Sequence, residues 1–180
     1  AALRHEGGTL TVHEDRRLDV VGATQVILAI NVGTNVRGRT PGDECGALAV
    51  PEESWDELVE DHAREYRRFY GGLKLELPGK GPDKAVDRRI EDFRRAPEDS
   101  TLSLLYFNFG RYLLCSSSGI GTLPPSLQGK WNEDPNPPWD CDYHADINLQ
   151  MNYWPAEPGN MALCARPLFD FIGNAIEHGR

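Results

Sequence analysis

The run TLSLLYFNFGRYLLC (Thr101–Cys115) constrains the fold more than any other part of the chain. Its residues follow a helical pattern that is apolar on nearly every side, so we expect a helix that is buried on most of its faces. Ser100 is expected to cap the start of this helix. Gly110 lowers helix stability by about 1 kcal/mol relative to alanine, a loss that close approach of a neighbouring helix would justify. The fold must therefore supply packing partners around this helix.

The charge of the chain argues against a nucleic-acid-binding protein. The chain has 180 residues and a formal net charge of −9, and no cluster of basic residues stands out. Such a chain repels polyanions, so we expect no nucleic-acid partner. The longest apolar runs are much shorter than a membrane span, so we expect no membrane partner either.

The cysteines argue against a zinc or redox motif. They are widely spaced and contain no C-x-x-C pair, which zinc knuckles and thioredoxin-like sites require. Cys115 lies in the apolar helical pattern and is predicted to be a small buried hydrophobe. No disulfide pairing is predicted among Cys45, Cys115, Cys141 and Cys164.

Both ends of the chain fall in ordinary-looking sequence. Ala1 is not an initiator methionine, and the final FIGNAIEHGR continues a helical pattern without a stop signal. We therefore expect an internal part of a longer protein, in which any signal peptide would lie upstream.

Residues 1–48 have the pattern of β-structure. Thr9–Val12 and Thr24–Val32 are rich in β-branched residues and are bounded by turn formers. The second run is apolar on both faces, which predicts a strand that is covered on both sides. The pattern is then broken by Gly33, Gly38, Pro41 and Gly42.

Residues 49–98 are predicted to be mainly helical. Ser54 and Glu57 have the spacing of a capping box, and Gly71-Gly72 gives the stop signal. Leu73–Leu77 alternates with period two and predicts a short strand. Residues 83–95 predict a polar helix, closed by Pro97. Apolar residues recur at helical spacing between Trp55 and Tyr70 and, in the second helix, at Val86, Ile90 and Phe93.

The segment Gly121–Asn160 separates two helical patterns and has no helical period of its own. It holds three of the chain's four tryptophans. Loops longer than about 12–15 residues are usually functional or disordered, and this segment is too aromatic to be disordered. A helical pattern resumes over Met161–Ile176, where Pro167 opens the last section. The segment is therefore the leading candidate for a functional site.

Polar residues occupy alternate positions in the second half of this segment. On an extended backbone, alternate side chains share a face. The floor of a pocket could then be lined by Asp142, His144, Asp146 and Asn148. Aromatic side chains could supply apolar walls for a sugar ring. The alternating residues are Asp142, His144, Asp146, Asn148, Gln150 and Asn152, and the aromatic walls are Trp131, Trp139, Tyr143 and Trp154.

Three interpretations of this cluster remain open from the residues alone. In the first, amides and carboxylates hold sugar hydroxyls and a water molecule while indoles stack on the ring. In the second, Asp142, His144 and Asp146 bind a metal ion, although a single histidine at this spacing matches no common metal motif. In the third, the polar groups cap helices and tie down the loop, and the tryptophans belong to the core.

A family resemblance favours the sugar site. The chain contains GTLPPSLQGKWN, then NPPW, then DYHADINLQMNYWPAE, and these motifs resemble the signature region of glycoside hydrolase family 95, the α-L-fucosidases. LLYFNFGRYLLCSSS (Leu104–Ser118) resembles the first barrel helix of that family. The resemblance is dense over 104–160, moderate over 54–77 and generic over 1–48.

The resemblance implies an α+β fragment made of three parts. Residues 1–48 would be the C-terminal part of an N-terminal β-sandwich domain. Residues 49–98 would be a helical linker region, and residues 99–180 would be the first helices of an (α/α)6 catalytic barrel.

The resemblance also implies a role for specific residues. The family inverts configuration, with an acid and a base roughly 6.5–9.5 Å apart and a water between base and sugar. Two asparagines in an N-x-N motif hold that water. Asn148 matches one of them, whereas Asp146 departs from the motif because a carboxylate cannot donate as an amide does. The implied sugar contacts are His144, Trp131, Asn132, Trp139, Tyr143 and Trp154.

The implied function is a fragment of an exo-glycosidase that removes terminal α-L-fucosyl or related L-galactosyl residues. The resemblance implies that the acid and main base lie beyond residue 180, so the isolated chain is expected to be inactive. Glu157, the local carboxylate, has the sequence context of a structural residue. No cofactor or metal is implied, the partner is a fucosylated glycan, and a secreted or periplasmic location is expected. The alternatives are a non-catalytic carbohydrate-binding or structural module, or another helical-barrel glycosidase.

Overall fold

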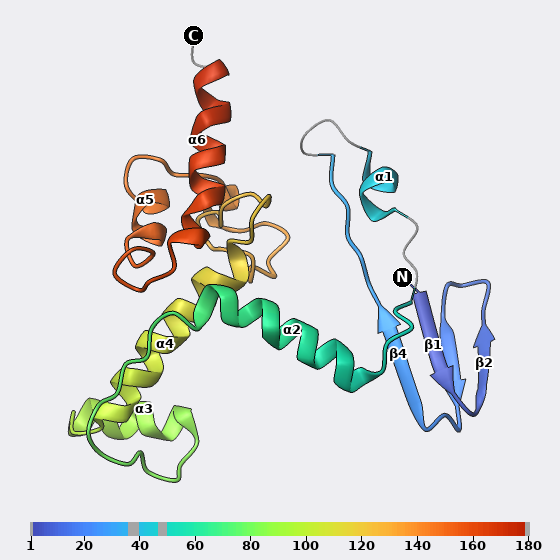
Figure 1. Cartoon of the computed structure of the whole chain (residues 1–180), viewed down its shortest axis with the longest axis horizontal. Helices are drawn as coiled ribbons and strands as arrows, with labels where there is room; N and C mark the ends of the chain where they lie inside the picture. Colours follow the sequence, from blue (N-terminus) through green and yellow to red (C-terminus); the bar gives the residue numbers. More distant parts are fainter. Residues whose placement is uncertain (1, 36–39, 47–49, 179–180) are drawn as a thin grey trace. The chain divides into compact units, whose positions relative to one another are not determined.

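The computed structural model describes residues 2–35, 40–46 and 50–178 of an α+β chain (Figure 1). The chain divides into two compact units, Ala1–Val59 and Glu60–Arg180. Gly38 and the predicted boundary between residues 48 and 49 lie outside the described residues. Within the described part, no helix is both long and apolar enough to cross a membrane.

The first unit contains two antiparallel two-stranded sheets. β1 (Ala2–Glu6) pairs with β4 (Gln25–Ala29), and β2 (Thr9–Val12) pairs with β3 (Leu18–Val21). Gly8, in the turn between β1 and β2, has a φ of +68°, and a Cβ there would lie 2.4 Å from the Val21 carbonyl oxygen. Only glycine fits such a turn, because it tolerates positive φ and has no side chain.

The structure confirms the strand at Thr9–Val12 and shortens the one predicted at 24–32. The expectation of a strand covered on both sides is wrong for β4. Ile27 is its one buried apolar side chain, and Val26 and Leu28 are 45% and 49% exposed. The physical reason is that a two-stranded sheet shields little of either face.

Pro41 begins a helix instead of only ending the β-pattern. α1 (Pro41–Cys45) has Thr40 as its N-cap, and the Thr40 hydroxyl accepts a hydrogen bond from the Asp43 amide at 3.2 Å. Proline suits the first helical position because the amide that it lacks would have no partner there.

The capping box predicted before α2 (Trp55–Tyr70) is confirmed. The Ser54 amide and hydroxyl each donate to Glu57 Oε2 at 2.8 Å, and the Glu57 amide donates back to Ser54 Oγ at 3.3 Å. The bonds from the Ser54 amide and hydroxyl hold the pKa of Glu57 below its usual value. Gly71 ends the helix as predicted, and a Cβ there would lie 2.7 Å from the Arg67 carbonyl oxygen.

The next two helices lie where the sequence predicts them, but one of them is capped by a different residue than predicted. They are α3 (Val86–Arg95) and α4 (Ser100–Ser117). Asp99 and not Ser100 caps α4, since Asp99 Oδ1 accepts from the Leu102 amide at 3.0 Å. The Ser100 hydroxyl instead donates to the Pro78 carbonyl at 2.7 Å. The strand predicted at 73–77 is wrong, because these residues form no strand.

The expectation that α4 is buried on most sides holds only for its C-terminal half. Leu114 and Cys115 are buried, as predicted for Cys115, whereas Tyr106 is 79% exposed and Phe109 is 52% exposed. No atom lies within 4 Å of a Cβ built on Gly110, once the helix's own backbone is set aside. The predicted close approach of another helix at Gly110 is therefore absent from the described structure.

The core of the second unit joins α4 to the elements that follow it. These are α5 (Asn148–Tyr153), the 3-10 helix η3 (Ala162–Ala165) and α6 (Arg166–His178). All four cysteines are unpaired thiols, and burial raises the pKa of Cys164 to about 12. The buried core consists of Leu114, Cys115, Leu149, Tyr153, Ala156, Met161, Cys164 and Ala165.

A buried arginine fastens α4 to the end of α2, where the two helices meet in Figure 1. Arg111 is 2% exposed. Its Nη2 donates to the Tyr70 carbonyl at 2.6 Å, its Nη1 donates to the Leu73 carbonyl at 3.3 Å, and its guanidinium lies 4.3 Å from the centroid of the Tyr70 ring. The negative end of the α2 dipole thus faces a buried cation, which is a favourable arrangement.

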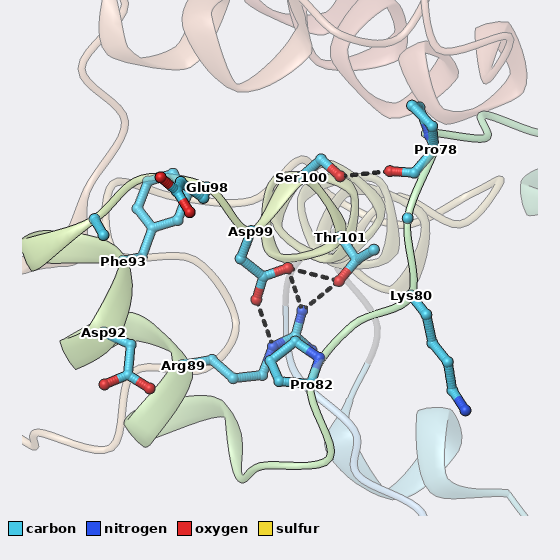
Figure 2. Close-up of a pocket in the computed structure, with 12 residues that line it drawn as sticks. Pro78, Lys80, Pro82, Arg89, Asp92, Phe93, Glu98, Asp99, Ser100 and Thr101 are labelled. Atoms are coloured by element: carbon cyan, nitrogen blue, oxygen red, sulfur yellow. Dashed lines mark hydrogen bonds and ion pairs between the residues drawn. The ribbon is translucent and has the colours of Figure 1, made fainter.

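A salt bridge connects α3 to the residue that caps α4 (Figure 2). Arg89 Nε donates to Asp99 Oδ2 at 2.9 Å, and the Thr101 hydroxyl donates to Asp99 Oδ1 at 2.7 Å. The hydrogen bonds from Arg89 and then from Thr101 lower the pKa of Asp99 to about 2. One carboxylate therefore serves as helix cap and as ion-pair partner.

Replacing Arg111 with alanine should strongly destabilise the chain. The change leaves the Tyr70 and Leu73 carbonyls without a donor and opens a cavity, so the free energy of unfolding should fall by about 3 kcal/mol or more in urea denaturation. Arg88→Ala is the control, because Arg88 is 68% exposed and should cost less than about 0.5 kcal/mol. Equal stability of the two variants would contradict this role.

Asp99→Asn should change how stability depends on pH. The folded-state pKa of about 2 lies below the ordinary 3.8, so the contribution of Asp99 is fully present above about pH 4 and is lost as the pH falls toward 2. Asparagine keeps the cap but not the charge. The urea midpoint of the variant should therefore vary less over this range than that of the wild type, with Glu98→Gln as the control. Parallel curves would refute the assignment.

Candidate functional site

The segment 121–160 is folded by contacts that its own residues make with one another. The Leu127 amide donates to the Asp142 carbonyl at 3.1 Å, and Gln128 Nε2 donates to the Pro138 carbonyl at 2.8 Å. Between them lies the short 3-10 turn η2 (Pro138–Cys141), in which Trp139 has a φ of +51°. The segment is thus an ordered support for side chains, as its aromatic content predicts.

Asp142 has an extended backbone, residues 142–144 belong to no helix or strand, and the chain then turns. Asp142 and His144 fall on one side, and Asp142 Oδ1 lies 2.6 Å from His144 Nε2. Residues 145–147 form a turn, and Asn148 is the first residue of α5. The prediction of one extended face from Asp142 to Asn148 is therefore wrong beyond His144. The physical reason is the helical turn that the Leu149 amide closes by donating to the His144 carbonyl at 3.0 Å.

The two predicted catalytic residues lie on the surface at the start of α5. Asp146 is exposed, and its Oδ1 accepts from the Ile147 amide at 3.1 Å. Asn148 is also exposed, and it borders a narrow cleft that it shares with His144, Asn152 and Ser126. The cleft is too tight to admit a water molecule. The structure thus brings Asn148 and His144 together at a cleft that has no room for a sugar ring.

The predicted aromatic walls are divided between different places. Trp139 and Trp154 are 70% and 61% exposed. Trp131 is 47% exposed and lines a cavity of about 250 Å³ together with Gln128 and Asn152. The structure therefore does not gather the three indoles around one ring-sized space.

Tyr143 and Asn132 are engaged within the chain. The Tyr143 hydroxyl donates to the Pro124 carbonyl at 2.7 Å, and its ring centroid lies 4.6 Å from that of Phe171. Burial raises the pKa of Tyr143 above its usual value. Asn132 Nδ2 donates to the Asp134 carbonyl at 3.0 Å in a local turn. Both residues support the segment, and sugar contact by either stays a prediction.

The metal interpretation finds no geometric support. In the part of the chain that the structure describes, no group of three or more His, Cys, Asp or Glu side chains converges as ion ligands would. Asp142 and His144 are adjacent, and Asp146 does not join them in such a group.

Sequence reasoning missed one partner of the predicted site residues. Asn152 shares the cleft with Asn148, and the signal for it was helical spacing, since residues i and i+4 lie on one face of a helix. Asp142 was predicted to share a face with His144, and the structure places its Oδ1 2.6 Å from His144 Nε2.

The Glu157 side chain has no role in this geometry. Its residue is exposed, and its carbonyl accepts from the Asn160 amide at 3.0 Å. The backbone thus uses Glu157 in the turn that closes the segment.

Comparison with known proteins assigns the chain to a family. Residues 54–180 match the model of the glycosyl hydrolase family 95 catalytic domain. The chain is 34% identical over 191 aligned residues to alpha-L-fucosidase 2 of Arabidopsis thaliana, covering 97% of this chain and 22% of that protein. It is 36% identical over 129 residues to a probable alpha-fucosidase A of Aspergillus niger, covering 70% of this chain and 16% of that protein. The chain spans about a fifth of the length of these relatives, and it belongs to glycosyl hydrolase family 95.

Proposed function

We propose that this chain is part of an inverting exo-glycosidase that hydrolyses terminal α-L-fucosyl, or related L-galactosyl, residues of glycans. The observation that carries the proposal is the exposed amide of Asn148 at the start of α5, beside His144, within the region that matches the catalytic domain. Two relatives carry the name alpha-fucosidase. The substrate partner is thus a fucosylated oligosaccharide.

The proposed chemistry assigns one step to this chain. In an inverting hydrolysis an acid protonates the glycosidic oxygen while a base removes a proton from the attacking water. The Asn148 amide can hold that water, because it can donate to the water oxygen and accept from a water hydrogen. Asp146 can only accept while it is ionised. The acid and the main base would come from residues beyond Arg180, and they would form the walls that this segment lacks.

The proposal extends to the architecture of the whole protein. Residues 1–48 would end a β-sandwich domain, residues 49–98 would form a linker, and residues 99–180 would begin an (α/α)6 barrel. The two antiparallel strand pairs within residues 1–48 and the helices α4, α5 and α6 within residues 99–180 support the proposal. A secreted or periplasmic location follows from the same proposal.

Turnover of fucosides by the full-length protein tests the proposal directly. Aryl glycosides of L-fucose, L-galactose and several other sugars would be compared, and the anomer released would be identified by NMR. Release of β-L-fucose from α-L-fucosides supports an inverting fucosidase. Preference for an unrelated sugar, or no hydrolysis at all, would overturn the assignment.

Replacing Asn148 with glycine in the full-length protein should lower kcat much more than it raises KM. The amide is proposed to act on the water in the transition state, and such groups are worth about 100-fold or more in kcat. Steady-state kinetics on an aryl α-L-fucoside measure both constants. Asn136→Ala is the matched control, since Asn136 is an exposed amide in the same segment. An unchanged kcat for the Asn148 variant would remove this role.

Asp146→Asn restores the amide pair of the family motif and is the sharper test of Asp146. If the carboxylate is a tolerated variant, kcat for α-L-fucosides should hold or rise. If the carboxylate accepts the water proton, kcat should fall by about 100-fold or more. The ratio of L-galactoside to L-fucoside turnover in the same variant shows whether Asp146 sets substrate choice.

A further inference from the structure

Asp142 and His144 make a close contact at the edge of the site. Asp142 Oδ1 lies 2.6 Å from His144 Nε2, and the side chains are 62% and 31% exposed. A carboxylate this close to a ring nitrogen favours the form of the ring that carries a proton on that nitrogen. A surface pair that served stability alone would contribute little, so the value of this one depends on what it orients.

The backbone on both sides of the pair is held in place. The Asp142 carbonyl accepts from the Leu127 amide at 3.1 Å, and the His144 carbonyl accepts from the Leu149 amide at 3.0 Å. Between them the Tyr143 hydroxyl donates to the Pro124 carbonyl at 2.7 Å. The backbone that carries the imidazole is thus held in place, and the side chain keeps its rotational freedom.

We propose that Asp142 is a positioning residue that holds the His144 ring in one orientation and one tautomer for substrate binding. A carboxylate beside Nε2 favours the neutral tautomer with the proton on Nε2, in which Nδ1 carries a lone pair. Among the described residues no partner of Nδ1 is found, and the His144 side chain is 31% exposed. Nδ1 is then an acceptor for a hydroxyl of the sugar. This inference rests on the proposed function, because it names the group that recognises the sugar.

A double-mutant cycle in the full-length protein tests the inference. Asp142→Ala should lower kcat/KM for an α-L-fucoside by about tenfold or more, the size seen when the partner of a functional histidine is removed. His144→Ala should lower it at least as much. Because Asp142 acts through His144, the double variant should be no worse than His144→Ala alone.

Two further variants separate positioning from a general effect on charge or folding. Asp142→Asn keeps an oxygen that accepts from Nε2, so it should retain more activity than Asp142→Ala. Glu133→Ala removes an exposed negative charge from the same segment and should leave kcat/KM unchanged. Losses that multiply in the double variant, or an Asp142→Ala variant equal to the wild type, would overturn the inference.

Crystal structures of the full-length wild type and of its Asp142→Ala variant test the positioning of His144 without an activity measurement. The ring should face Asp142 in the wild type and rotate in the variant. An unchanged ring in the variant would falsify the positioning role. If the wild type hydrolyses no fucoside, the proposed function fails, and the ring orientation in these two structures alone decides whether Asp142 positions His144.

Discussion

The second unit depends on one buried cation. Arg111 reaches from α4 to the carbonyls of Tyr70 and Leu73, where the end of α2 would otherwise leave buried acceptors without donors. The same junction receives a third donor from far along the chain, since Asn160 Nδ2 donates to the Gly72 carbonyl at 2.6 Å. A buried guanidinium is tolerated because carbonyl dipoles and an aromatic face replace its water. The end of α2, the middle of α4 and the end of the site segment therefore meet at one point.

This junction explains why a segment with no secondary-structure period can be ordered. Its end is fixed at Asn160, and its start follows directly from the buried end of α4, where Ser118 bonds to the Tyr153 hydroxyl at 3.1 Å. Inside the segment, Tyr143 packs on Phe171 of α6 and bonds to the Pro124 carbonyl. The aromatic residues thus divide into two groups. Those with partners hold the segment, and the exposed indoles are available for other contacts.

The chemistry of the site follows from how the backbone turns after His144. Asp142 lies against His144, and after the turn Asn148 lines one cleft together with His144. The family membership of the chain and the exposure of Asn148 support a water-holding role within a larger site. Under the proposed function, Asp146 carries a carboxylate where the family resemblance implies an amide, so it is the position at which substrate choice or catalysis would differ.

The sequence by itself determined the features that depend on neighbours a few residues away. The capping box of Ser54 and Glu57, the strand at Thr9–Val12 and the family motifs are of this kind, because short-range hydrogen bonds and periodicity specify them. The tertiary structure decided the rest. Asp99 and not Ser100 caps α4 because Arg89, on another helix, holds its carboxylate. The predicted extended face beyond His144 gave way to a helical turn, because that choice depends on packing between segments that alternation in the sequence does not encode.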